Sequence, residues 1–262
     1  MIKTASELEK MAASGALLAS VFARIDQMAL AGMTTMQVND QVEAYIVNDL
    51  QARPASKGQY DYPYVLNASR NDVVCHGMPS HDETIMDGEI INFDITLEKD
   101  GYIADSSKTY MVGTVSPHAS RLVRVTYEAL WKGIGAVRPG ATLGDIGYAI
   151  ERHAKRHEYT IVRDYCGHGI GREMHEEPQV LHFGKPGTGE RLREGMVFTI
   201  EPMLNQGTAK VKSEKDGWTV VTKDGKLSAQ FEHTVAVTGN GVRVLTLRKG
   251  EEKMLASIRN AA

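Results

Sequence analysis

Residues 88–94 read Gly88-Glu-Ile-Ile-Asn-Phe-Asp94, and residues 195–201 read Gly195-Met-Val-Phe-Thr-Ile-Glu201. Both segments start on a glycine and end on a carboxylate, and they lie 107 positions apart. A second pair, Gly32-Met-Thr34 and Gly140-Ala-Thr142, is separated by 108 positions. Solenoid repeats recur every ~20 to 50 residues, so this longer spacing predicts an internal duplication with pseudo-twofold symmetry.

The duplication predicts two similar halves, at about 1–115 and 116–262, within one domain that spans residues 1–262. No linker rich in Pro, Gly or Ser separates them. Each half is expected to contain two helices and a set of strands. Because the apolar faces of the strands need helices to cover them, the expected fold class is an α+β layer architecture.

Two helices are expected at the start of the first half. Apolar residues at intervals of three and four predict an amphipathic helix from residue 6 to about 30, ended by Gly32. Thr4 and Glu7 have the spacing of a capping box at its start. A second helix is expected from about Thr35.

The same helical pattern returns in the second half. Apolar residues predict a helix over about 122–137, which Gly140 closes. Thr142 is the expected start of another helix. This second pair of helices supports the division into two halves.

Polar and apolar residues alternate along the predicted strands. In Asn92-Phe-Asp94-Ile-Thr96 the polar side chains share one face of the strand. Glu201 ends the matching strand, and the strand that follows each of the two carries another acid, Asp105 or Glu232. Four carboxylates converging in a groove raise one another's pKa values, so we expect cations between them.

Two histidines lie in glycine-containing turns. His168 lies in Cys166-Gly-His168-Gly-Ile-Gly171, where the backbone can approach a ligand closely. Imidazole is a common metal ligand, so His168 is the expected nitrogen donor. His76 lies in a similar turn, Cys75-His76-Gly77.

Other histidines are assigned no role. His153 and His157 are four residues apart on a predicted helix, which fits a metal site by spacing, but Lys155 and Arg156 lie between them. We therefore assign both to a solvated helix face. The remaining histidines have no supporting context: His81, His118, His182 and His233.

Four carboxylates and one imidazole suit two divalent ions such as manganese, iron or cobalt, with zinc as a further choice. Two such ions share a water, lower its pKa and present hydroxide to a polarised carbonyl. The sequence has no Gly-x-Ser-x-Gly, P-loop, His-Glu-x-x-His or Gly-x-Gly-x-x-Gly motif. Metal-assisted hydrolysis is the predicted chemistry.

The composition excludes several other classes of protein. The chain has 30 basic and 33 acidic residues and a net charge of −3, which argues against a dedicated nucleic-acid binder. It has two cysteines, no apolar signal segment and no run of ~18 apolar residues. We therefore expect a cytoplasmic protein that does not enter a membrane. The best basic candidate is a predicted hairpin with Lys210, Lys212, Lys215, Lys223 and Lys226.

Several motifs, in order along essentially the whole chain, resemble those of bacterial type I methionine aminopeptidases: NDVVCHG (71–77), NFDITLEKDGYIADSSKTYMVG (92–113), YCGHGIGREMHEEP (165–178), FTIEPM (198–203) and DGWTVVTKDGKLSAQFEHTVAVT (216–238). The resemblance implies the pita-bread fold, a pseudo-symmetric α+β fold around a dinuclear metal centre. It also implies removal of the initiator methionine from nascent proteins when the second residue is small and uncharged.

The resemblance implies a ligand role for each expected donor. Asp94 would chelate one ion, and Asp105 and Glu232 would bridge both ions. His168 and Glu201 would complete the coordination of the other ion. This set coincides with the one derived above from alternation and charge.

The resemblance also implies catalytic roles. Glu201 would handle the proton of the bridging water, His175 would stabilise the oxyanion, and His76 would contact the scissile amide. Thr96 and Thr199 lie two positions from predicted ligands on the same strand faces, so we expect them to support those ligands.

By the same resemblance, Tyr62, Met174 and Trp218, with Cys75 nearby, would form an apolar pocket for the methionine side chain. Two positions depart from the family pattern and affect the expected shape of this pocket. Asn67 stands where a cysteine is common, and Met174 stands where an aromatic residue is common.

The family often holds a monovalent cation through backbone oxygens, and Asn71, Val73 and Ser228 match those positions. The implied partners are the N-termini of nascent polypeptides, with the ribosome surface as a candidate partner of the lysine hairpin. A monomer is the habit of the family.

Two other functions remain open. The first is a non-catalytic binding protein on the same scaffold, and the second is an Xaa-Pro peptidase with the same chemistry. Cleavage of Met-Ala-Ser against Ala-Pro-Ala separates the two enzymatic alternatives.

Overall fold

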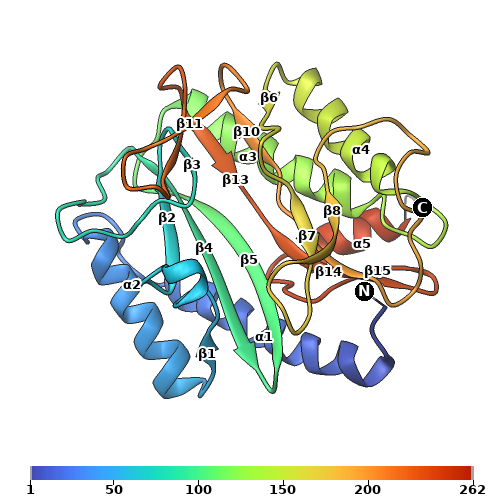
Figure 1. Cartoon of the computed structure of the whole chain (residues 1–262). Helices are drawn as coiled ribbons and strands as arrows, with labels where there is room; N and C mark the ends of the chain where they lie inside the picture. Colours follow the sequence, from blue (N-terminus) through green and yellow to red (C-terminus); the bar gives the residue numbers. More distant parts are fainter. Residues whose placement is uncertain (1, 261–262) are drawn as a thin grey trace.

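The structure is a computed structural model that describes residues 2–260, with helices and strands in two similar successions (Figure 1). The α-helices are α1 (Ala5–Ile25), α2 (Thr35–Ala44), α3 (Pro117–Ile134), α4 (Leu143–Arg156) and α5 (Glu252–Asn260). The strands of the first half are β1 (Arg53–Pro54), β2 (Leu66–Arg70), β3 (Val73–Cys75), β4 (Ile90–Lys99) and β5 (Tyr102–Met111). Those of the second half are β6 (Thr160–Ile161), β7 (Gly167–Gly169), β8 (Glu176–Val180), β9 (Val197–Ile200), β10 (Met203–Asn205), β11 (Val211–Ser213), β12 (Val220–Thr222), β13 (Ser228–Gln230), β14 (His233–Thr238) and β15 (Gly241–Val244).

The strands pair in antiparallel sheets. In the first half, β4 pairs with β1, β2 and β5. In the second half, five strands follow the order β15-β14-β9-β7-β8. Two smaller sheets, β13-β10-β6 and β11-β12-β3, complete the arrangement, and the second of them joins strands of both halves. The strands that carry or flank the four predicted acids are thus neighbours, β4 beside β5 and β9 beside β14.

The predicted duplication is visible in the backbone hydrogen bonds. The Gly32 N–H donates to the Ile85 carbonyl at 2.8 Å, and the Gly140 N–H donates to the Leu192 carbonyl at 2.9 Å. Both glycines have positive φ, +88° and +85°, a conformation that other residues adopt only with strain. The same turn therefore occurs twice, at the separation found in the sequence.

The residues that follow these glycines cap equivalent helices. Thr34 starts α2 and Thr142 starts α4, each within a capping box. Thr34 also pairs with Thr84 in an isolated bridge, and Thr142 pairs with Arg191 in the same way. These contacts confirm the duplicated α+β architecture and the predicted starts of α2 and α4.

The predicted ends of two helices are wrong. α1 begins at the predicted capping box of Thr4, but it ends at Ile25 rather than near residue 30. α3 ends at Ile134 rather than near 137, and it also begins earlier than predicted, at Pro117 rather than near 122. In each half, the residues just before the next helix pair instead with a later extended segment, as Ile85 does with Met33. Gly32 and Gly140 therefore belong to the turns before α2 and α4 and do not cap α1 and α3.

Helices cover the apolar faces of the strands. Figure 1 shows α1 and α2 (blue) on one side of the molecule and α3 and α4 (green to yellow) on the other. In the first half, Leu18 of α1 and Val38 of α2 pack in one buried cluster with Phe93 of β4. In the second half, Ile150 of α4 packs in another cluster with Phe198 of β9. The polar faces of these strands are thereby left for the site.

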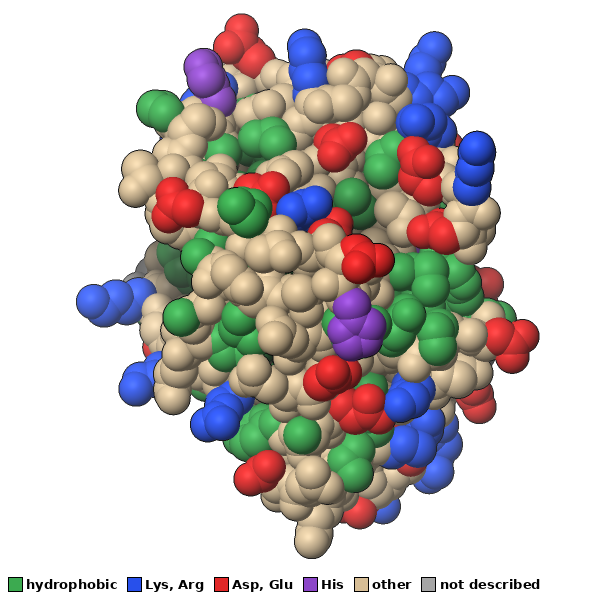
Figure 2. Space-filling model, turned by 90° about the vertical axis from the view of Figure 1, so that its left-hand side faces the viewer, with side chains coloured by type: hydrophobic (Ala, Val, Ile, Leu, Met, Phe, Trp, Pro, Cys, Tyr) green, Lys and Arg blue, Asp and Glu red, His purple; other side chains and the backbone are tan. Residues whose placement is uncertain are grey.

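One face of the molecule carries a mixture of charges. On the face drawn in Figure 2, basic and acidic side chains are interspersed, and no patch of one sign covers it. Among residues 2–260, no helix combines the length and the apolar character needed to cross a bilayer.

Candidate metal centre

The four predicted acids and His168 line one pocket of ≈ 520 Å³. Asp94 lies on β4 and Asp105 on the neighbouring strand β5. Glu201 directly follows β9, and Glu232 directly precedes β14, the strand that pairs with β9. The polar faces of both halves therefore meet in this pocket.

His168, on β7, is oriented towards the acids. Its Nε2 lies 3.8 Å from Oδ2 of Asp105 and 3.7 Å from Oε1 of Glu201. Its Nδ1–H donates to the Gly169 carbonyl at 2.9 Å, so Nε2 carries the free lone pair. Burial lowers the pKa of His168 to about 4, and His175 adds to this effect. The ring is therefore neutral, as a metal ligand must be.

Burial raises the pKa of all four acids. It raises the pKa of Asp94 to about 6 and that of Glu201 to about 8. The pKa values of Asp105 and Glu232 are raised well above their usual range by burial and then by the neighbouring carboxylates. Without cations, this set of carboxylates is electrostatically unfavourable.

The donor set fits divalent cations. Donor atoms of Asp105, His168 and Glu232 lie within 4.8 Å of one another. Within the described part of the chain, the buried Oδ1 of Asp105 has no hydrogen-bond partner. A buried carboxylate oxygen of this kind needs a counter-charge, and four carboxylates with one imidazole match the preference of divalent transition metals.

Thr199 supports two of the predicted ligands, as expected. Its hydroxyl donates to Oε1 of Glu201 at 2.7 Å and accepts from the His168 N–H at 3.0 Å. One hydroxyl therefore holds both the Glu201 carboxylate and the backbone N–H of His168. The Thr96 hydroxyl instead pairs with the Ser56 hydroxyl at 2.5 Å, so the expected support of Asp94 is not seen among the hydrogen bonds of the described residues.

His76 and His175 line the same pocket. The rings of His175 and His168 lie edge to face, with centroids 4.4 Å apart. The His76 ring packs edge-on against Tyr165, at 5.4 Å. Burial lowers the pKa of both histidines, so near neutral pH each ring is uncharged and can donate one N–H.

The predicted apolar wall also lies in this pocket: Tyr62, Cys75, Met174 and Trp218 all line it. The rings of Tyr62 and Trp218 lie 4.9 Å apart. The Tyr62 hydroxyl donates to the Leu66 carbonyl at 2.9 Å, so its polar atom is already engaged. An apolar compartment therefore adjoins the acids.

Three further residues contact the acids. Asn67 Nδ2 donates to Oδ2 of Asp94 at 3.4 Å. The asparagine that stands where a cysteine is common in the family therefore contacts a predicted ligand. Gln230 Nε2 donates to Oε2 of Glu201 at 3.3 Å, and the Glu201 N–H donates to Nε2 of buried His182 at 3.1 Å. Alternation could have revealed Gln230, which lies two residues before Glu232. His182, judged to have no supporting context, has no local signal because folding alone brings it to Glu201.

Two of the three positions that match a monovalent-cation site, Asn71 and Ser228, are in contact. The Ser228 N–H donates to the Asn71 carbonyl at 2.9 Å. The buried Oγ of Ser228 has no hydrogen-bond partner among residues 2–260. Val73 lies on β3, two residues after Asn71.

The assignment of His153 and His157 to a solvated face is wrong. Lys155 and Arg156 are exposed, but both histidines are half-buried. Nε2 of His153 lies 3.1 Å from Oε2 of Glu128 on α3. The two rings therefore face the neighbouring helix, because the α3–α4 packing covers the side of α4 on which they lie.

The sequence profile of Metallopeptidase family M24 matches residues 9–239. The chain belongs to this family. It is 49% identical over 241 residues to "Methionine aminopeptidase A" of Synechocystis sp., covering 92% of this chain and 95% of that protein. It is 47% identical over 250 residues to "Methionine aminopeptidase" of Salmonella typhimurium, covering 95% of each.

Solved structures agree with the M24 assignment. The structure of methionine aminopeptidase from Rickettsia prowazekii superposes with a TM-score of 0.92 at 46% identity, covering 94% of this chain and 99% of that one. A prolidase from Pyrococcus horikoshii superposes at a TM-score of 0.74 and 22% identity, covering 95% of this chain and 64% of that one, and this shows the fold alone. The expected pita-bread fold is confirmed, and the chain is a metallopeptidase by family.

Proposed function

We propose that this M24 chain is an aminopeptidase that removes the initiator methionine from nascent proteins whose second residue is small and uncharged. Relatives of that name that align over nearly the whole chain support the proposal. The observation that carries it is that Tyr62, Met174 and Trp218 line the same pocket as the five metal donors. A bound methionine side chain could therefore lie in an apolar compartment while its carbonyl reaches the acids.

The donors would hold two divalent ions, cobalt, manganese, iron or zinc. Asp94 would hold one ion, His168 and Glu201 the other, and Asp105 and Glu232 would bridge them. When bound, such ions activate a water and polarise the scissile carbonyl. The buried Oδ1 of Asp105 and the lone pair on Nε2 of His168 support this assignment.

The protein's own groups would move protons and orient the peptide. Glu201, whose two carboxylate oxygens contact Thr199 and Gln230, would take up the proton of the water and pass it on. His175, beside His168, would donate its N–H to the developing oxyanion. His76 would contact the scissile amide from its place against Tyr165.

The setting follows from the same proposal. The chain would act as one catalytic domain over 1–262, since donors come from both halves. It would work as a cytoplasmic monomer on the N-termini of nascent polypeptides, with no nucleic-acid specificity. The hairpin of β11 and β12, which bears lysines, is the candidate contact with the ribosome surface. Asn71, Val73 and Ser228 would hold a monovalent cation.

Peptide hydrolysis tests the proposal directly. The purified chain should release methionine from Met-Ala-Ser, lose this activity with a chelator, and regain it with Mn²⁺ or Co²⁺. Ala-Pro-Ala should remain intact, because its first side chain does not fill the apolar compartment. Preferred cleavage of Ala-Pro-Ala would overturn the substrate assignment in favour of an Xaa-Pro peptidase. Failure to cleave either peptide with any of the four metals would overturn the catalytic assignment.

A further inference from the structure

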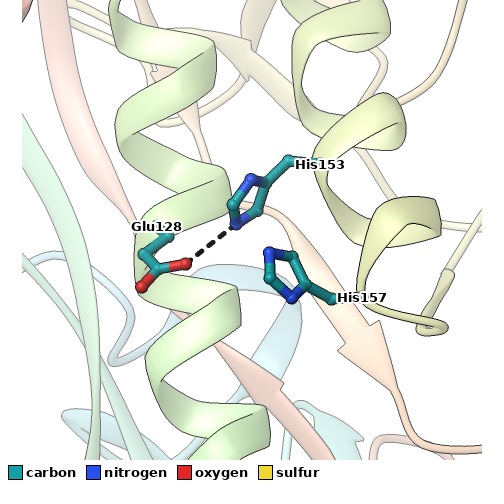
Figure 3. Close-up of side chains that lie close together, drawn as sticks. All are labelled: Glu128, His153 and His157. Atoms are coloured by element: carbon teal, nitrogen blue, oxygen red, sulfur yellow. Dashed lines mark hydrogen bonds and ion pairs between the residues drawn. The ribbon is translucent and has the colours of Figure 1, made fainter.

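A second group of metal-binding side chains lies between α3 and α4 (Figure 3). His153 and His157 are on one side of α4, and Glu128 on α3 points towards them. One donor atom from each residue lies within 4.8 Å of the others. These helices cover the apolar side of the second-half strands, where Ile150 and Phe198 belong to one buried cluster. This group does not line the central pocket.

We propose that Glu128, His153 and His157 form a binding site for one divalent transition-metal ion, with Zn²⁺ as the best match. Two imidazoles and one carboxylate from two helices are a common donor set for zinc, with a water in the fourth position. Tetrahedral geometry with zinc–ligand bonds of about 2 Å places ligand atoms roughly 3.3 Å apart. The three donor atoms lie within 4.8 Å of one another, and Oε2 of Glu128 is already 3.1 Å from Nε2 of His153.

The surroundings preorganise this site. Arg124 donates to Oε1 of Glu128 at 2.6 Å, which holds the carboxylate and leaves Oε2 directed at His153. A Cβ on Gly133 would lie 2.7 Å from Cδ1 of Ile150, so the two helices are as close as the absence of a side chain permits. The donors therefore project from helices whose separation is fixed by the core.

The charges near the site act in both directions. His157 caps the C-terminal end of α4, where the helix dipole favours a cation. Two cations on α3 oppose binding through their positive charge: Lys132, exposed and one turn after Glu128, and Arg124, which pairs with the Glu128 carboxylate. Lys132→Gln is therefore expected to tighten metal binding, an effect that a purely structural His153–Glu128 hydrogen bond would not produce.

Equilibrium dialysis of the metal-stripped protein against Zn²⁺ tests the proposal. The unchanged chain should bind one more Zn²⁺ per chain than the double variant His153→Ala/His157→Ala, because both proteins keep the central site. The matched control, His81→Ala/His118→Ala, removes two exposed histidines and should bind as the unchanged chain does. Equal stoichiometry in the unchanged chain and His153→Ala/His157→Ala would overturn the site.

Glu128→Gln tests whether the double variant His153→Ala/His157→Ala loses Zn²⁺ binding only because it folds poorly. This substitution keeps the shape of the side chain and should weaken the binding of this one Zn²⁺ by at least about tenfold. Saturating Zn²⁺ should raise the Tm by on the order of 5 °C more in the unchanged chain than in Glu128→Gln. Equal affinity and equal Tm shifts, with native circular dichroism, would contradict the assignment of Glu128.

Discussion

The two halves of the molecule share a scaffold but differ in what they bring to the pocket. Asp94 and Glu201 occupy equivalent places at the separation of the repeat. Asp94 accepts a hydrogen bond from the amide of Asn67, and burial raises its pKa to about 6. Glu201 contacts Thr199 and Gln230, and burial raises its pKa to about 8. Asp94 and Glu201 therefore occupy matching positions in the repeat, but different side chains contact them.

The prediction with the largest expected effect tests this difference between Asp94 and Glu201. Glu201→Gln should lower kcat by ~10² to 10⁴, because the amide cannot accept the proton in the reaction. The measurement is methionine release under saturating metal, together with the metal content of the variant. Asn67→Ala removes the amide that contacts the equivalent Asp94, and it should change kcat several-fold at most. A kcat of Glu201→Gln within threefold of that of the unchanged chain would contradict the role of Glu201.

The next prediction compares the two cores. Phe93 on β4 and Ile200 on β9 occupy equivalent positions, and both are 0% exposed. Phe93→Ala should lower the free energy of unfolding by ~3–5 kcal/mol, and Ile200→Ala by ~2–5 kcal/mol. Urea denaturation of the metal-free protein measures both.

Met86→Ala is the control for these two substitutions. This side chain is 55% exposed, and its loss should change stability by no more than about 0.5 kcal/mol. If only one of the two core substitutions destabilised the protein, the cores would not contribute equally to one cooperative fold.

A buried ion-pair network links the second half to the first. Arg248 donates from Nη1 to the Ser107 carbonyl of β5 at 2.9 Å and from Nε to Oε1 of Glu251 at 3.1 Å. Burial raises the pKa of Glu251, but His233 and Arg248, which contact its carboxylate, outweigh burial and hold the pKa well below its usual range. The charged form of Glu251 therefore stabilises the fold.

The pH dependence of this network has a defined sign. The folded pKa of Glu251 is depressed, so its contribution is complete above the unfolded value of about 4.3 and is lost as the pH falls through the folded pKa. At pH 7, Glu251→Gln should cost about 3 kcal/mol, since it leaves Arg248 buried without its partner. Urea titrations at decreasing pH should show this difference shrinking below about pH 4. A difference that grew on acidification would contradict the prediction.

The smallest expected effects on stability concern the equivalent N-caps of helices α2 and α4. Thr34→Ala and Thr142→Ala should each cost about 1 kcal/mol, because each removes the acceptor of a capping box. Thermal unfolding measures both, and Thr→Ser at either position should restore most of the loss. A cost at one cap and none at the other would show that the duplicated turns are no longer equivalent in energy.

Much of the site was accessible from sequence because it depends on local patterns. Alternation along a strand puts Asp94 on the polar side and Phe93 on the other, and this needs no knowledge of tertiary structure. The capping threonines Thr34 and Thr142 likewise mark the starts of α2 and α4, because a capping box depends only on residues three positions apart. Helix ends were less accessible, because Met33 pairs with Ile85, which is distant in sequence.

The sequence by itself determined the repeat, the capped starts of α1, α2 and α4 and the chemistry of the proposed donors, since each depends on residue types at short or regular spacing. Only the tertiary structure decided that His182 and Asn67 contact these donors and that His153 and His157 face Glu128. The physical reason is that packing sets which side chains meet across elements. Burial in that packing then sets their pKa values, and neither is encoded in a local pattern.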